Sequence, residues 1–182
     1  MVDPSPRPTH AAIARALLDS GSVRFGRFTL ASGQTSDVYV DVKRAWTDPG
    51  RLTLLAEALA DRVGSTDRLA GMELGACRSW SPPHCGPATR SSSSARPPRI
   101  TAPASATRGR IRTGDRVLLI EDVATTGGSS LESIAVLREQ GAVVDRALVV
   151  VDRESGAIER LAGAGVRLEP LVTLAYLRGQ SP

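Results

Sequence analysis

The sequence predicts an α/β domain with a mainly parallel central sheet flanked by helices. Extended and helical patterns alternate along most of the 182 residues, which is typical of this fold class. Two aliphatic runs, at 116–121 and 142–151, suit strands that are buried on both faces. Aromatic residues make up only 3% of the chain, so Val, Leu and Ala must build the core.

The first part of the chain is expected to hold two helices and two extended segments. Apolar residues recur at helical spacing over 10–20, where a glycine then ends the helix. Extended segments are predicted at 25–30 and 38–42, with a Ser-Gly turn between them. Asp48 is an N-cap acceptor followed by a first-turn proline, and it begins a helix that runs to about Val63.

The later elements are indicated by short aliphatic runs, each separated from the next by glycine-containing turns. Their alternation predicts strands joined by crossover helices, and therefore parallel pairing. In chain order we expect a strand at 68–71, a strand at 116–121, a helix at 129–140, a strand at 142–151, a short helix at 158–162 and an extended segment at 171–174.

Residues 77–108 differ from the rest of the chain. They hold six of the twelve prolines, ten Ser or Thr, five arginines and no acidic residue. Removing those five positive charges from the net charge of +4 leaves the remainder at −1, so no nucleic-acid partner is expected. Cys77, His84 and Cys85 fall short of the four ligands of a structural zinc site. We expect the segment to be poorly ordered.

The expected organisation is one domain over 10–182, preceded by a disordered Pro-rich terminus at 1–9. The sequence has neither a signal-peptide pattern nor an apolar run of about 18 residues. It therefore predicts a cytoplasmic protein with no membrane partner.

The segment 117–129 carries the clearest chemical signal. A buried strand ends in two carboxylates, Glu121 and Asp122, and a loop from Thr125 to Ser129 then begins a helix. Ligands of open α/β sheets bind beyond the carboxyl ends of the strands. Hydroxyls and free N–H groups at a helix start suit a phosphate, and the carboxylates suit vicinal hydroxyls. Together they predict a site for a ribose 5-phosphate group.

Segment 117–129 resembles the phosphoribosyl-pyrophosphate signature of type I phosphoribosyltransferases. Three further segments resemble the orotate phosphoribosyltransferase family: 25–33 with 39–41, 71–75, and 151–156. The resemblance covers roughly 10–76 and 109–178. It implies the type I phosphoribosyltransferase fold, with a small hood formed by N-terminal and C-terminal segments.

The resemblance also implies residue roles. Glu121 and Asp122 would hold the ribose hydroxyls, and the loop that follows would hold the 5-phosphate. Arg153 would bind the orotate carboxylate, for which a guanidinium fork is suited, although a solvated surface arginine is equally expected from the sequence. Tyr39 would stack on the base or belong to the core, and Glu73 lies in the pyrophosphate loop. The phosphoribosyl-pyrophosphate residues are Glu121, Asp122, Val123, Ala124, Thr125, Thr126, Gly127, Gly128 and Ser129, and the orotate residues are Thr125 and Arg153.

The implied reaction is displacement of pyrophosphate from C1 of the ribose by a ring nitrogen of orotate, which gives orotidine 5-phosphate. Mg²⁺ would be bound mainly through pyrophosphate and ribose oxygens, with no ligand directly from the protein. In this family a mobile loop rich in Lys, with a His-Gly, reaches into the neighbouring subunit's site. The resemblance therefore implies a homodimer, with orotate and phosphoribosyl pyrophosphate as small-molecule substrates.

The resemblance implies that this catalytic loop lies between Gly75 and Gly109, where residues 77–108 stand, and degenerate codons in an alternative reading frame can restore it. Read from the third base of each codon, TCx codons for the four serines at 91–94 become Phe, Leu, Ile or Val codons. The codons of Arg96 and Arg99 can supply lysines, and those of 100–104 can supply Asp-His-Gly-Thr-Gly. We hypothesise that two compensating frame changes bracket about 77–108. The chain as it stands is then expected to be unstable or inactive, because a buried strand is lost.

Other functions remain open on the sequence. A purine phosphoribosyltransferase shares the phosphoribosyl signature, although Arg153 and the 25–41 element argue against it. A regulator that only senses phosphoribosyl pyrophosphate would need a nucleic-acid-binding appendage, for which residues 1–20 are too short. A non-catalytic relic is compatible with the content of 77–108.

Overall fold

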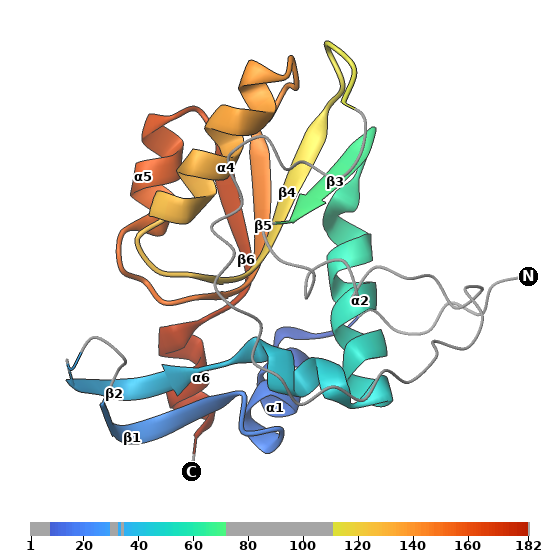
Figure 1. Ribbon diagram of the computed structural model, residues 1–182. Coiled ribbons are helices and arrows are strands. Elements are labelled where there is room, and N and C mark those ends of the chain that lie inside the picture. The colour runs from blue at the N-terminus through green and yellow to red at the C-terminus, as the bar shows by residue number, and fades with distance from the viewer. Residues whose placement is uncertain (1–7, 30–32, 34, 72–110, 182) are drawn as a thin grey trace, which may run out of the picture.

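The structure is a computed structural model that describes residues 8–29, 33, 35–71 and 111–181. Within these residues the central sheet has four parallel strands in the order β3-β4-β5-β6 (Figure 1). The predictions for Glu73, for 77–108 and for most of the N-terminal segment 1–9 lie outside the described residues. The strands are β3 (Arg68–Gly71), β4 (Val117–Ala124), β5 (Arg146–Asp152) and β6 (Arg167–Thr173).

Helices cover both faces of this sheet, as the double-sided burial of its strands requires. Alternate residues of β4 enter two cores: Leu118 and Ile120 belong to one, and Val117 and Leu119 to the other. The first core includes α1 (His10–Asp19), α2 (Pro49–Val63) and α6 (Leu174–Gln180). The second includes α4 (Gly128–Glu139) and α5 (Ala157–Gly163). The α/β fold with a parallel sheet is therefore confirmed.

A second, two-stranded antiparallel sheet stands apart from the main one (Figure 1). It consists of β1 (Val23–Thr29) and β2 (Thr35–Val40), and the pairing shifts between Phe25 and Phe28. A 3-10 helix, η1 (Val42–Thr47), leads from it to α2. Helix α6 directly follows the carboxyl end of β6. The N-terminal hairpin lies beside it, beyond the carboxyl ends of the sheet strands (Figure 1).

Most predicted elements are present, and their caps follow the expected chemistry. The side chain of Asp48 accepts a hydrogen bond from the Arg51 N–H at 2.9 Å, which begins α2 as predicted. Thr9, which the sequence placed in the disordered terminus, caps α1 by accepting from the Ala12 N–H at 3.2 Å. Within the described ranges, no helix has both the length and the apolar character needed to cross a bilayer.

Several boundaries differ from the expectations. The extended segments predicted at 25–30 and 38–42 are β1 and β2, each of which begins two or three residues earlier, and Val42 belongs to η1. Strand β5 begins at Arg146 rather than at 142, because only Val143 of the preceding segment makes a bridge, with Arg116. Strand β4 runs past the two carboxylates to Ala124. The extended segment expected at 171–174 is the end of β6, and Leu174 already begins α6, which the sequence did not predict.

Candidate active site

The residues singled out in the sequence lie at the carboxyl edge of the parallel sheet. Glu121 and Asp122 occupy the second half of β4, and the loop 125–127 joins that strand to α4. Arg153 follows the last residue of the neighbouring strand β5. Its backbone N–H donates to the Ala124 carbonyl at 2.9 Å. The structure therefore brings the predicted phosphoribosyl segment and the predicted orotate residue side by side.

Glu121 is a buried carboxylate, only 9% exposed, with one oxygen satisfied and one not. The Ser130 hydroxyl, in the first turn of α4, donates to Oε2 at 2.7 Å. Oε1 is buried without a hydrogen-bond partner. Burial raises the pKa of Glu121 above its ordinary value and the nearby Asp122 charge raises it further, while the Ser130 hydrogen bond opposes the change. An unsatisfied buried acceptor at a strand end is suited to receive a ligand hydroxyl.

Asp122 is less buried than Glu121, and its carboxylate is held by the backbone of the next residue. Its Oδ1 accepts a hydrogen bond from the Val123 N–H at 2.9 Å. Adjacent residues of a strand point to opposite faces. Glu121 and Asp122 therefore present their carboxylates on different sides of β4.

The loop before α4 requires glycine at Gly127. Its φ of 72° lies in the left-handed region. A Cβ there would stand 2.5 Å from Leu161 Cδ1 and 3.3 Å from the Ala157 Cα, both on α5. The loop therefore packs directly against α5 at this position. The N–H groups of the loop and the first turn of α4 then form a cradle in which an anion is favoured.

Arg153 has a half-buried side chain, and its Nε is buried without a hydrogen-bond partner. The residue before it, Asp152, is 1% exposed and accepts from the Glu154 N–H at 3.0 Å. Burial raises the pKa of Asp152, partly offset by that backbone hydrogen bond. A guanidinium with a free Nε donor is suited to a bidentate anion such as a carboxylate.

The two remaining predicted residues are not placed with this group. The ring of Tyr39, on β2, has its centroid 5.7 Å from that of Phe28, and the Arg24 guanidinium lies 4.8 Å over it. These contacts lie within the hairpin, and stacking of Tyr39 on a base stays a prediction. Glu73 falls outside the described residues.

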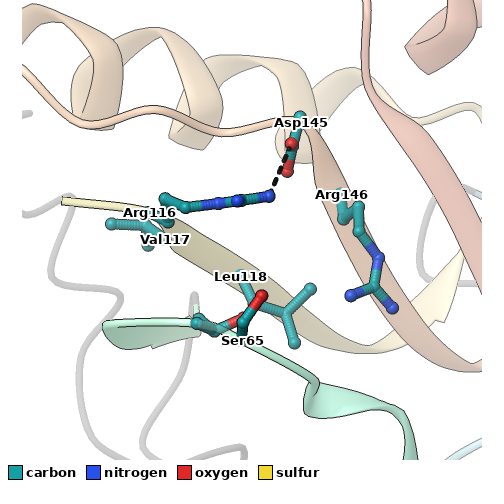
Figure 2. Close-up of a pocket in the computed structure, with 7 residues that line it drawn as sticks. Ser65, Arg116, Val117, Leu118, Asp145 and Arg146 are labelled. Carbon is teal, nitrogen blue, oxygen red and sulfur yellow. Dashed lines mark hydrogen bonds and ion pairs between the residues drawn. The ribbon is translucent and has the colours of Figure 1, made fainter. Parts of the chain in front are cut away.

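A small cavity lies at the amino ends of the sheet strands, at the other end from the candidate site (Figure 2). Its volume is about 30 Å³, and it is lined by residues from the amino ends of β4 and β5, including Arg116 and Asp145, which form a 3.4 Å ion pair. This edge is remote from Glu121 and Arg153, so the cavity does not belong to the candidate active site. Among the described residues, no three His, Cys, Asp or Glu side chains come together to hold a metal ion.

Sequence reasoning missed the residues that support this site. Ser130 was counted only as part of a helix, and Asp152 and Glu154 only as neighbours of Arg153. The hydrogen bond between Ser130 and Glu121 could not be predicted from the sequence pattern, because it depends on the exact residue at which α4 begins. The hydrogen bond that Asp152 accepts from the Glu154 N–H is a common Asx turn, and an Asp at the end of a predicted strand was the available signal.

The curated proteins to which the chain is similar include several orotate phosphoribosyltransferases. No protein-family model matches it. The orotate phosphoribosyltransferase of Methanocaldococcus jannaschii is 38% identical over 171 residues, which cover 89% of this chain and 93% of that protein. That of Natronomonas pharaonis is 42% identical over 166 residues, with the same coverage of 89% and 93%. The chain belongs to the orotate phosphoribosyltransferase family.

Solved structures agree with this assignment. The crystal structure of orotate phosphoribosyltransferase from Aeropyrum pernix superposes with a TM-score of 0.69 at 31% identity, covering 92% of this chain and 98% of that one. Leishmania donovani UMP synthase gives a TM-score of 0.71 at 33% identity, and the chain spans 37% of that longer protein. The type I phosphoribosyltransferase fold and the assignment to an enzyme family of pentosyltransferases are confirmed.

Proposed function

We propose that the chain binds phosphoribosyl pyrophosphate and orotate at the carboxyl edge of its parallel sheet, as a site for transfer of the ribose 5-phosphate group to orotate. The observation that carries this proposal is the hydrogen bond from the Arg153 N–H to the Ala124 carbonyl. It sets a cation suited to a planar carboxylate next to a cradle suited to a phosphate. A crystal structure of the Mycobacterium tuberculosis enzyme is a complex with phosphoribosyl pyrophosphate, which supports the same ligand here.

The roles follow from the chemistry of each group. The 5-phosphate lies in the loop from Thr125 to Ser129, and its charge is held by N–H groups at the start of α4. The buried Oε1 of Glu121 accepts a ribose hydroxyl and so gains the partner it lacks. Arg153 orients orotate through its carboxylate, with its ring nitrogen toward C1 of the ribose. In the transition state this arrangement holds the reactants in line while pyrophosphate leaves.

Mg²⁺ is proposed as the metal of the reaction, bound through pyrophosphate and ribose oxygens. Glu121 and Asp122 present their carboxylates on different sides of β4, and no group of three acids, His or Cys forms a metal site among the described residues, so the protein offers no complete ligand set there. When bound, Mg²⁺ would neutralise negative charge on the leaving pyrophosphate. A homodimer and a cytoplasmic location are proposed on the family resemblance.

The leaving-group half of the site falls on residues 72–110, which are outside the described ranges. The segment 77–108 has no lysine, and it carries the arginines and prolines described above in place of the family's Lys/His loop. Binding by the cradle and by Arg153 depends on the described residues alone. We therefore propose that the chain as it stands retains the ligand-binding half of the site while transfer is slow.

The test is pyrophosphate release from phosphoribosyl pyrophosphate with orotate, adenine, hypoxanthine or guanine as acceptor. It is carried out on the chain as it stands and on the frame-restored chain, in which 77–108 is replaced by the translation of its own codons in the alternative frame. Release with orotate alone by the frame-restored chain supports the proposal. Release with a purine base contradicts it. So does an affinity for orotidine 5-phosphate that Arg153→Ala leaves unchanged.

A further inference from the structure

The turn that carries Arg153 is held on both sides. On one side Asp152, almost fully buried, accepts from the Glu154 N–H at 3.0 Å. Glu154 itself has a φ of 54°, in the left-handed region that residues other than glycine rarely adopt. It is the one non-glycine residue with positive φ in the described part of the chain. A conformation of this kind persists only where surrounding contacts fix it.

On the other side Glu154 reaches the C-terminal helix. Its Oε2 accepts from the Ala175 N–H, in the first turn of α6, at 2.6 Å. Thr173, the N-cap of α6, accepts from the Tyr176 N–H at 3.3 Å. Thr173 is also the β6 partner of Asp152 in the parallel sheet. The turn after β5 and the start of α6 are therefore joined through both backbone pairing and the Glu154 carboxylate.

The last turn of α6 is in turn joined to the hairpin. Arg178 forms an ion pair with Asp37 on β2, and its guanidinium lies 5.2 Å from the ring centroid of Phe25 on β1. The hydrogen bond from Arg178 lowers the pKa of Asp37, and the charges of Arg178 and Arg153 act in the same direction. Helix α6 thus spans from the Arg153 turn at one end to the hairpin at the other.

We propose that Glu154 is a positioning residue for Arg153, and that its bond to α6 sets the Arg153 guanidinium at the height and angle from which it selects a carboxylate-bearing base. The inference rests on the proposed role of Arg153 in binding orotate. The Arg153 Nε has no partner in the described residues, so that atom does not fix the guanidinium. Its backbone does: the N–H is bonded to Ala124, and the following residue is bonded to α6.

The consequence concerns specificity more than phosphate binding. Orotidine 5-phosphate and uridine 5-phosphate share the ribose, the phosphate and the pyrimidine ring, and only the first carries the carboxylate. The phosphate loop and Glu121 hold both nucleotides alike. The ratio of the two affinities therefore isolates the contribution of a well-placed Arg153.

The experiment is calorimetric titration of the full chain with each nucleotide. The variants are Glu154→Ala, Glu154→Gln and Arg153→Ala, with Glu139→Ala as the matched control, since Glu139 is an exposed acid at the far end of α4. We expect Glu154→Ala to lower the preference for orotidine 5-phosphate by roughly 5- to 10-fold, the scale of one net hydrogen bond, while uridine 5-phosphate affinity is unchanged. Glu154→Gln keeps an acceptor oxygen and should lose less.

The outcomes separate the inference from the function on which it rests. If Arg153→Ala abolishes the preference and Glu154→Ala leaves it intact, the positioning role is overturned while the proposed function stands. If Arg153→Ala leaves the preference intact, or the parent chain has none, the proposed orotate site is overturned as well. If Glu154→Ala loses both nucleotides, Glu154→Gln decides: a lowered preference with normal uridine 5-phosphate binding supports the inference, and an unchanged preference overturns it.

Discussion

Replacing Glu121 with Gln is expected to stabilise the fold and to weaken ligand binding at the same time. The carboxylate is 9% exposed, one oxygen is bonded to Ser130 and the other is buried without a partner. Gln keeps the acceptor for Ser130 and removes the buried charge. Leaving a buried polar atom unsatisfied costs about 1–3 kcal/mol, and more for a charged group. Because the amide nitrogen of Gln would also lack a partner, we expect a net gain of about 1 kcal/mol at neutral pH.

The pH dependence gives this prediction its sign. The folded-state pKa of Glu121 is raised above the ordinary value of 4.5, so the folded chain holds that proton more tightly than the unfolded chain. Stability is therefore lost as the pH rises from 4.5 through the folded-state pKa, and Glu121→Gln escapes that loss. The stabilising effect should be absent below the ordinary pKa and complete above the raised one.

Thermal melts of the frame-restored chain across this pH range measure the effect. A gain of about 1 kcal/mol corresponds to a rise of about 2–4 °C in Tm for a chain of this size. Titration with orotidine 5-phosphate should show a loss of roughly 10- to 100-fold in affinity, because the ribose hydroxyl loses a charged acceptor. A variant that melts below its parent at neutral pH, or that binds the nucleotide normally, would refute the reasoning.

Three further predictions follow from the same structure. Arg146→Met should lower stability by about 1–3 kcal/mol, because the guanidinium donates twice to Glu169 at 3.1 Å and to the carbonyl of Arg62 at 2.9 Å; denaturant titration measures it. Gly127→Ala should destabilise by about 2 kcal/mol or more from its positive φ and the 2.5 Å approach to Leu161, seen as a lower midpoint. Sequencing of the coding DNA should show codons across 77–108 that read as an aliphatic strand and a Lys/His loop in the alternative frame.

Each of these has a control or a contrary outcome. Arg15→Met removes an ion pair with Asp19 that is 84% exposed on the arginine side, and should change stability by less than about 0.5 kcal/mol. The loss in Arg146→Met should shrink in acid, since Arg146 lowers the pKa of Glu169 and that stabilisation disappears as the carboxylate is protonated. A Gly127→Ala chain that melts like its parent contradicts the close-packed turn, and codons that exclude the alternative reading end the frame hypothesis.

The elements that the sequence predicted well are those whose signals are local. The start of α2 depends on Asp48 and the proline after it, and β4 depends on a run of aliphatic residues, so both were found within a few residues. Helix α6 was missed because Leu174 continues an aliphatic run, while Thr173, at the end of β6, caps the helix by accepting from the Tyr176 N–H. The start of β5 was misplaced because Ala142–Asp145 has strand composition without a full set of pairing partners.

The site divides in the same way. The acids and the glycine loop on β4 could be predicted together because they are contiguous, and contiguity after a buried strand fixes where they lie. The proximity of Arg153 to that loop follows from parallel pairing of β4 and β5, which a sequence pattern indicates but does not align. The Glu154 bond to α6 could not be predicted, since it joins two segments 21 residues apart through a helix that was not foreseen.

The decisive measurement is orotate-dependent pyrophosphate release, made in parallel on the chain as it stands and on the frame-restored chain. We expect release by the frame-restored chain with orotate and none with purine bases, and little or no release by the chain as it stands. Orotate-dependent release by the chain as it stands, together with a cooperative melt, would contradict the claim that 77–108 displaces the catalytic loop. Purine-dependent release by the frame-restored chain would contradict the assignment of Arg153 to orotate.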